Sequence, residues 1–145
     1  MALVFHLADN KTDFARCVFL RGIVFGAGQN IAVNDEIDDL EETCRHILGL
    51  DDDQPCATAR WRVYKPGVGK IERVAVHPNW QGRGIGMALM EAVAADIKAA
   101  MPDCTRLRLG AQDYAIPFYQ RLGFEVEGEG FMDAGIPHHW MEKAA

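Results

Sequence analysis

Glycines punctuate the stretch Gln81–Gly86, which reads QGRGIG and offers the clearest chemistry in the sequence. The apolar, strand-like segment Ile71–Val76 precedes it, and Met87–Met101 then repeats apolar residues at helical spacing. Since glycine has no Cβ, the N–H groups around Gly84 and Gly86 can converge on an anion, and the positive end of the following helix dipole adds to the attraction. This spacing predicts a cradle for phosphate or pyrophosphate.

Two common phosphate-binding loops do not fit this stretch. A dinucleotide-binding Rossmann loop needs GxGxxG after the first strand, whereas here the third position after Gly84 is Met87 and the loop lies past the middle of the chain. A Walker A loop needs a Lys-Ser or Lys-Thr pair directly after its glycines, and no such pair follows any glycine run in this sequence. The sequence therefore disfavours a dinucleotide-binding oxidoreductase and an NTPase.

The length and composition of the chain fit one domain over residues 1–145. Hydrophobic residues make up 49% and charged residues 25%, no segment approaches the length of a membrane span, and the opening residues lack the basic start of a signal peptide. We therefore expect a cytoplasmic protein with no membrane partner. The net charge of −6 argues against sequence-independent binding to nucleic acid, which rests on clustered Lys and Arg.

The cysteines and histidines do not form a recognisable metal site. Cys17, Cys44, Cys56 and Cys104 are scattered without a CxxC pair, and neither HExxH nor HxxxH occurs. We expect no metal and no disulfide framework, and we interpret the cysteines as small apolar residues or inert thiols.

Hydrophobic periodicity predicts strands and helices along the whole chain. The expected strands cover residues 3–8, 45–50, 57–64, 70–76, 105–110, 124–127 and 138–141, although 45–50 also fits the helical period. The expected helices cover 13–25, capped by Thr12 and ended by Gly26 and Gly28, then 87–101 and 114–122. This order is typical of a mixed α/β domain.

Acidic residues dominate Asn34–Glu42 (NDEIDDLEE), which we expect to form a short exposed helix or turn. Two interpretations stay open. The run is either an ordinary solvated face or a surface that attracts a cationic substrate.

Two motifs together resemble the GNAT N-acetyltransferases. Gln81, Gly84 and Gly86 occupy the family's Q/R-x-x-G-x-G/A loop between a central strand and a long helix, and AIPFYQRLGF matches its A-x-x-x-Y-x-x-x-G-F helix, with Tyr119 at the tyrosine position. A narrower resemblance is to the small bacterial ElaA-like and YjcF-like subgroup. It rests on an R-x-x-V-F-x-x-E-Q stretch, in which Gly28 here replaces the glutamate, and on the later segments RHILG, ARWR, GAQ and GIPH.

This resemblance implies a fold and an acyl donor. The implied fold is mixed α/β, with a largely antiparallel central sheet that is splayed in the middle and helices on both faces. The implied donor is acetyl-CoA, with its pyrophosphate on the glycine loop, and the implied assembly is a homodimer. The residues that the resemblance places at the donor are Val74, Ala75, Val76, Gln81, Gly82, Arg83, Gly84, Ile85, Gly86, Met87, Gln112, Phe118 and Tyr119.

Amide formation from a thioester needs a neutral amine, stabilisation of the carbonyl oxygen and a proton for the departing thiolate. The backbone N–H of Val76 is the candidate hydrogen-bond donor that would stabilise the carbonyl oxygen of the thioester. Tyr119 is the candidate general acid that would give a proton to the thiolate. Glu72 is the candidate general base, because strand parity places it on the face of Val74 and Val76, where burial would raise its pKa. Simple pairing of Glu72 with Arg60, Arg62 or Arg73 stays open as the other explanation of this residue. A histidine (His77, His138 or His139) or a water chain stays open as the alternative base.

The expected function is therefore transfer of an acetyl group from acetyl-CoA to a primary amine of a small molecule or peptide. A non-catalytic acyl-CoA-binding sensor, which would keep the cradle but lack turnover, is the alternative. The acceptor amine cannot be named from the sequence.

Overall fold

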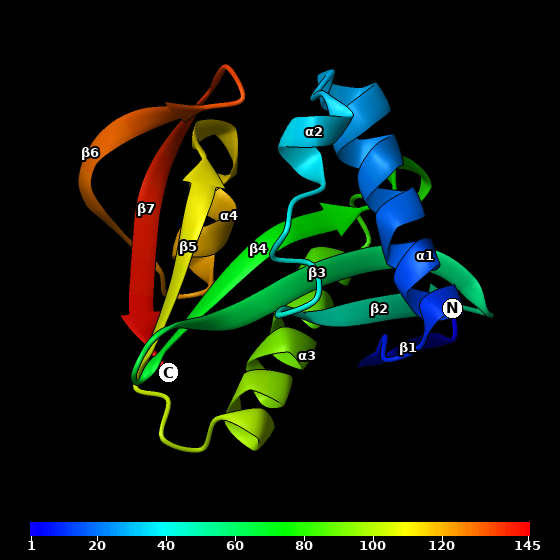
Figure 1. Ribbon diagram of the computed structural model, residues 1–145, viewed down its shortest axis with the longest axis horizontal. Coiled ribbons are helices and arrows are strands. Elements are labelled where there is room, and N and C mark those ends of the chain that lie inside the picture. Colours follow the sequence, from blue (N-terminus) through cyan, green and yellow to red (C-terminus); the bar gives the residue numbers. More distant parts are fainter.

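The computed structural model describes residues 1–145, and its centre is one seven-stranded sheet with the order β1-β2-β3-β4-β5-β7-β6 (Figure 1). Every neighbouring pair is antiparallel except β4 and β5. The strands are β1 (Leu3–Leu7), β2 (Arg45–Asp51), β3 (Gln54–Lys65), β4 (Val68–Val76), β5 (Arg106–Gln112), β6 (Glu125–Asp133) and β7 (Ile136–Ala144). The helices are α1 (Lys11–Arg21), α2 (Val33–Glu36), α3 (Ile85–Ala100) and α4 (Ile116–Arg121). The predicted mixed α/β class is confirmed.

The sheet opens between its two parallel strands. β4 and β5 pair only from Val68 with Arg106 to Ile71 with Leu109, and past that point the remainder of β4 has no partner on this side. Figure 1 shows β4 and β5 diverging toward their carboxyl ends. The expected splay in the middle of the sheet is therefore present.

Helices cover both faces of the sheet, and two neighbouring residues of β2 show why. Leu48 is fully buried in a small cluster with Cys17 and Leu20 of α1. Ile47 belongs to the main core, which includes Leu89 of α3. Since successive side chains of a strand point to opposite faces, α1 and α3 pack on opposite sides of the same strand.

The helix after the glycine loop forms as predicted and packs firmly on the sheet. Its buried residues recur at helical spacing and are Ile85, Leu89, Met90, Val93 and Ile97. Each fully buried side chain of this size stabilises the fold by about 1.5–3 kcal/mol. A polar anchor adds to this packing, because Asp96 accepts hydrogen bonds from Arg45 of β2 (2.8 Å) and from the indole N–H of Trp61 on β3 (2.7 Å).

The predicted ends of the first helix were wrong. Asn10, not Thr12, is the N-cap: its backbone is extended and its side-chain oxygen accepts from the N–H of Asp13 (2.9 Å). At the other end, Gly26 and Gly28 do not end the helix as predicted, because a π-helical segment, Gly22–Ala27, continues directly from α1 and Gly28 keeps right-handed helical angles (φ −75°, ψ −34°).

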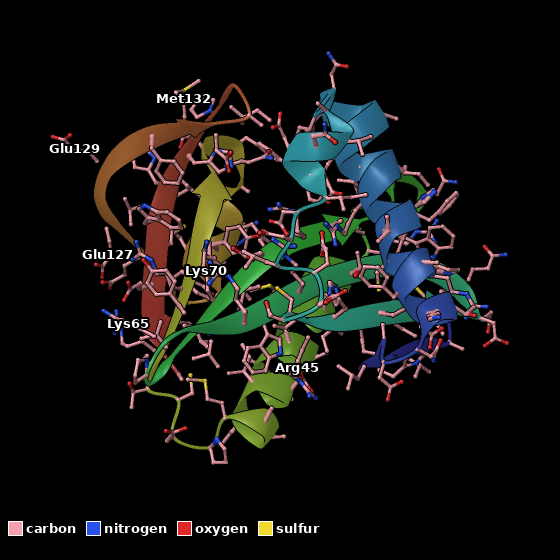
Figure 2. The ribbon with its side chains drawn as sticks, viewed as in Figure 1. Arg45, Lys65, Lys70, Glu127, Glu129 and Met132 are labelled. Carbon is pink, nitrogen blue, oxygen red and sulfur yellow. The ribbon has the colours of Figure 1, made fainter.

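The last two strands are longer than predicted. The prediction limited them to 124–127 and 138–141, whereas β6 and β7 each have nine residues and form one hairpin. The full length of β6 was missed because Gly128 and Gly130 interrupt the apolar alternation of its sequence. The pairing of β6 with β7 nevertheless resumes after a bulge between Glu127 and Phe131. Much of β6 is exposed, and Glu129 and Met132 point outward in Figure 2.

Candidate active site

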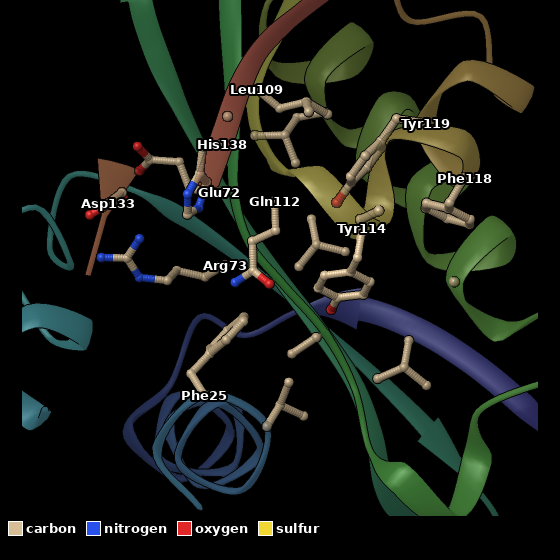
Figure 3. Close-up of a pocket in the computed structure, with 18 of the residues that line it drawn as sticks. Phe25, Glu72, Arg73, Leu109, Gln112, Tyr114, Phe118, Tyr119, Asp133 and His138 are labelled. Atoms are coloured by element: carbon tan, nitrogen blue, oxygen red, sulfur yellow. The ribbon is translucent and has the colours of Figure 1, made fainter. Parts of the chain in front are cut away.

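A cleft of about 700 Å³ opens where β4 and β5 separate (Figure 3). Both predicted catalytic residues and all of the predicted donor-binding residues except Arg83 line it. These lining residues are Glu72, Val74, Ala75, Val76, Gln81, Gly82, Gly84, Ile85, Gly86, Met87, Gln112, Phe118 and Tyr119. The structure thus gathers residues from β4, the glycine loop, α3, β5 and α4 around one cavity.

The glycine loop leaves the start of α3 free for a ligand. Gly82 and Gly84 have φ angles of 78° and 77°, which L-residues rarely adopt, and a Cβ added at either would meet nothing within 4 Å. Gly84 is the N-cap of α3 and offers no capping side chain, and Ala88 makes the first bond of the helix, to the Gly84 carbonyl (3.2 Å). The N–H groups of the first turn are therefore available to an anion, at the positive end of a 16-residue helix.

Gly86 also allows a close approach between two helices. It lies inside the first turn of α3, and a Cβ there would come within 3.2 Å of the ring of Phe118 on α4. Its missing side chain therefore lets α4 approach α3 closely, and this contact brings Phe118 and the neighbouring Tyr119 to the cleft.

Arg83 lies apart from the other predicted residues. It is exposed, outside the cleft lining, and no carboxylate lies within 4.0 Å of its guanidinium. The side-chain amide of Gln81 donates a hydrogen bond to the carbonyl of Val76 (3.2 Å), which connects the glycine loop to the end of β4.

The backbone of β4 presents a hydrogen-bond donor to the cleft. The N–H of His77 donates to the carbonyl of Cys56 on β3 (2.8 Å). Successive N–H groups of an extended strand point in opposite directions, so the N–H of Val76 points away from β3, toward the side where β5 has diverged. This donor can stabilise negative charge that develops on a carbonyl oxygen.

Tyr119 combines burial with access to the cleft. Its ring packs edge-on against Phe118 (5.1 Å between centroids) and Phe124 (5.9 Å), and the residue is 8% exposed. Burial, with a smaller contribution from Tyr114, raises the pKa of Tyr119 above its usual range. The phenol therefore keeps its proton and can donate a hydrogen bond to a ligand atom in the cleft.

The parity argument for Glu72 was wrong because β4 contains a bulge. Arg73 has a φ of 55°, and the pairing with β3 jumps from Arg60 opposite Glu72 to Thr58 opposite Ala75. The extra residue reverses the alternation, so Val74 and Val76 pack against the main core, whereas the side chain of Glu72 lies on the opposite face.

The expected rise in the pKa of Glu72 was also wrong. Its carboxylate contacts Lys70 (2.6 Å), Arg60 (3.1 Å) and Arg62 (3.5 Å). Burial alone would raise the pKa of Glu72, but the bond to Lys70 and the surrounding positive charges outweigh it and lower the pKa. A carboxylate held in its charged form by three cations is a weak proton acceptor.

The acidic run Asn34–Glu42 is only partly solvated: Asp35, Asp39 and Glu42 are exposed, whereas Glu36 is buried and Asp38 and Glu41 are partly buried. Glu36 and Glu41 pair with Arg21 of α1, which is 1% exposed, and Glu41 also contacts Arg60 (2.8 Å). Two more carboxylates, Asp38 and Glu72, complete the shell of Arg60. These residues form a buried ionic network that holds the segment after α2 against the sheet.

Gln112 bridges the open side of the cleft. Its side chain and that of Gln29 exchange two hydrogen bonds, of 2.8 and 2.9 Å, although 83 positions separate them in the chain. Gln29 also lies within 3.4 Å of the hydroxyl of Tyr114. The amide pair joins the segment after α1 to the end of β5, and Figure 3 shows Gln112 reaching toward the middle of the cleft.

Of the far wall of the cleft, the sequence analysis considered only His138, as an alternative base. Phe131 of β6 stacks on Trp140 of β7 at 4.7 Å and on His138 of β7 at 5.5 Å, and all three line the cavity. Asp35 from α2 and Asp133 from the end of β6 lie on the same lining. The sequence carried one weak signal for this wall, the apolar and aromatic alternation of Ile136–Met141 (IPHHWM).

The two adjacent histidines of β7 have different surroundings. The Nδ1 atom of His138 lies 2.7 Å from the carbonyl oxygen of Ile136, and the ring faces the cleft. His139 points the other way along the strand and bonds Asp113 (2.7 Å), and it does not line the cleft.

No group of three or more His, Cys, Asp or Glu side chains is arranged to hold a metal ion. None of the helices has the length and apolar character needed to cross a membrane.

Comparison with known proteins identifies the family. Residues 28–145 match the family described as "Acetyltransferase (GNAT) domain". A Bacillus subtilis protein named "Uncharacterized N-acetyltransferase YjcF" is 37% identical over 138 residues, which is 94% of this chain and 96% of that protein. The crystal structure of Escherichia coli ElaA superposes with a TM-score of 0.86 at 28% identity, over 97% of this chain and 99% of that one.

A second solved structure agrees in fold and family. It is an acyl-CoA N-acyltransferase from Pseudomonas aeruginosa, with a TM-score of 0.86 and 27% identity over 99% of this chain and all of that one. The resemblance to the ElaA-like and YjcF-like subgroup is confirmed. The chain belongs to the GNAT family of acetyltransferases.

Proposed function

We propose that this protein transfers an acetyl group from acetyl-CoA to a primary amine of a small molecule or peptide. The observation that carries the proposal is a single cleft that joins three features: the uncapped start of α3, the N–H of Val76 and the hydroxyl-bearing ring of Tyr119. Membership of the GNAT family supports it.

The proposed donor site follows the shape of the cleft. The pyrophosphate binds the free N–H groups of Ile85, Gly86 and Met87, because a helix start attracts anions and Gly84 leaves the space above it open. The pantetheine arm runs along Val74–Val76, where β4 lacks a partner strand. The thioester carbonyl then accepts a hydrogen bond from the N–H of Val76, and the sulfur lies toward Tyr119.

The proposed reaction is direct attack on the thioester. The lone pair of the amine forms a C–N bond to the acetyl carbon, and the oxygen charge that develops is stabilised by the N–H of Val76. The C–S bond then breaks, and Tyr119 donates a hydrogen bond, and finally a proton, to the thiolate of CoA. The amine nitrogen loses one proton, so the products are the acetamide and the free thiol.

A non-catalytic acyl-CoA sensor is the second candidate. The observation that favours it is the state of Glu72, the predicted base, which three cations keep in its charged form. Such a protein would bind CoA in the same cleft without turnover.

Two measurements decide between these functions. The first is the melting temperature with and without CoA, which should rise with CoA concentration for either function, since ligand binding to the folded state stabilises it. The second is release of free thiol from acetyl-CoA in the presence of a panel of mono-, di- and polyamines, aminoglycosides and lysine peptides. Thiol release with at least one amine supports the enzyme, CoA binding without release from any amine supports the sensor, and no CoA-dependent stabilisation contradicts both.

A further inference from the structure

We propose that His138 is the general base that takes the proton from the acceptor amine. This inference rests on the proposed acetyl transfer and adds a catalytic residue to it. Glu72 was the predicted base, but the ionic network engages it, and His138 lines the same cleft with one ring nitrogen unused.

The backbone fixes which nitrogen of His138 carries hydrogen. The Nδ1 atom lies 2.7 Å from the carbonyl oxygen of Ile136. A carbonyl oxygen can only accept, so Nδ1 must be the donor, and in the neutral ring Nε2 then has a free lone pair. The Nε2 atom of His138 makes no hydrogen bond within the protein. It is nevertheless not fully buried, in contrast to the three buried nitrogens that lack a hydrogen-bond partner, which are His46 Nδ1, Arg62 Nε and Arg108 Nε. It is therefore an acceptor that a ligand in the cleft can reach.

Strand pairing places this lone pair at the wide end of the splay. His138 lies directly opposite Gln112 in the pairing of β5 with β7 and directly opposite Phe131 in the pairing of β6 with β7. Side chains opposite one another in an antiparallel pair project from the same face. The stack on Phe131, with 22° between the ring planes, and an exposure of only 9% hold the imidazole in one orientation.

Charged side chains from four elements line the cleft together with His138. They are Asp35 and Glu36 of α2, Lys70, Glu72 and Arg73 of β4, Arg121 of α4 and Asp133 of β6. Lys70 pairs with Glu72 (2.6 Å) and Arg73 with Glu36 (3.6 Å), so these four charges largely offset one another. Asp35, Asp133 and Arg121 form no salt bridge within the protein.

The step that this assigns to His138 is balanced. The attacking amine forms the C–N bond to the acetyl carbon, and Nε2 of His138 accepts one N–H proton from that nitrogen. The C–S bond breaks, and the thiolate receives one proton from Tyr119. The imidazolium and the phenolate return to their starting states by exchange of one proton with solvent.

The test uses a variant that removes only the proposed base. In His138→Asn the side-chain amide nitrogen can replace Nδ1 as donor to the Ile136 carbonyl, while no atom replaces Nε2. His139→Asn is the matched control on the same strand, outside the cleft. The measurements are kcat/KM for the best acceptor of the amine panel from pH 6 to pH 10, the affinity for CoA and the melting temperature.

We expect His138→Asn to lower kcat/KM at neutral pH by about 10²–10⁴-fold, the usual contribution of a general base. CoA affinity should stay within about twofold, and the deficit should shrink at high pH, where solvent supplies the free amine. His139→Asn should keep wild-type kcat/KM. In a second variant, His138→Ala, added imidazole should restore part of the lost rate, which it cannot do for a residue that only supports the fold.

Three results would overturn the proposal, and they distinguish a failure of this assignment from a failure of the proposed function. If the wild type turns over an amine and His138→Asn keeps its kcat/KM, or if His138→Ala is slow and imidazole does not restore it, His138 is not the base and the acetyl transfer stands. If none of the amines in the panel makes the wild type release thiol from acetyl-CoA, the proposed function itself is contradicted, and the assignment of His138 is contradicted with it.

Discussion

Replacing Gly84 by alanine tests where the donor pyrophosphate binds. Gly84 has a φ of 77° and ψ of 9° as the N-cap of α3, and a Cβ there meets nothing within 4 Å. The methyl group therefore causes no clash in the free protein. It enters the open space where we place the pyrophosphate, and the strained backbone tends to turn the first N–H groups of α3 away from it.

The expected loss of stability follows from the backbone angle alone. An L-residue in the left-handed region costs about 1–2 kcal/mol. For a domain of this size, 1 kcal/mol lowers the melting temperature by about 3 °C, so Gly84→Ala should melt about 3–6 °C below wild type. Loss of one charge-assisted hydrogen bond to phosphate, about 1.5–3 kcal/mol, should weaken CoA binding by about 10–150-fold.

Gly128→Ala is the matched control. Gly128 has a φ of 74°, a Cβ there also meets nothing within 4 Å, and it lies in β6 away from the cleft. Both variants should therefore lose similar stability, which thermal melts measure, whereas calorimetric titration with CoA should show weaker binding only for Gly84→Ala. Equal CoA affinity in the two variants would refute the placement of the pyrophosphate over the start of α3.

Two further predictions concern other parts of the site. Tyr119→Phe should lower kcat by about 10–150-fold with little change in CoA affinity, because it removes one hydrogen bond to the developing thiolate; unchanged kcat would reduce Tyr119 to a packing partner of Phe118. Burial alone would raise the pKa of Glu41, but the bonds to Arg21 and Arg60 outweigh burial and lower this pKa from 4.5 to about 2. The charged form of Glu41 therefore contributes about 3 kcal/mol to the free energy of unfolding above pH 4.5, and this contribution is lost as the pH falls toward 2. Glu41→Gln should therefore unfold at a lower urea concentration than wild type at pH 7. The difference between the two urea midpoints should narrow between pH 4.5 and 3, and a difference that stays constant with pH would contradict a stabilising role for the charge of Glu41.

The parts of the site that depend on local chemistry could be predicted from the sequence. The glycine loop and α3 were found because left-handed turns need glycine and because Leu89, Val93 and Ile97 recur at the period of a helix. Tyr119 was found through a helix motif whose residues are neighbours in the chain. In these cases the information lies within about one turn of the residue concerned.

The parts that depend on distant pairing could not be predicted. Nothing in the sequence indicates that β4 contains a bulge at Arg73. The positive φ of Arg73 is stabilised by a contact with another element, because its guanidinium donates a hydrogen bond to the carbonyl of Glu36 on α2 (3.0 Å). The burial of Arg21 and Arg60 likewise requires carboxylates from elsewhere in the chain. His138 reaches the cleft only because β7 inserts between β5 and β6 in the sheet, an order that periodicity does not encode.

The bulge at Arg73 explains why the two halves of the proposed reaction have different surroundings. Without the extra residue, Glu72 would share a face with Val74 and Val76, and a carboxylate would stand beside the proposed thioester. Its charge would oppose the negative charge that develops on the carbonyl oxygen. The bulge instead turns Glu72 into the ionic network and leaves an apolar wall along the pantetheine path. The backbone strain of about 1–2 kcal/mol at Arg73 thereby separates the donor path from the charges, and proton transfer is left to His138 on the far wall.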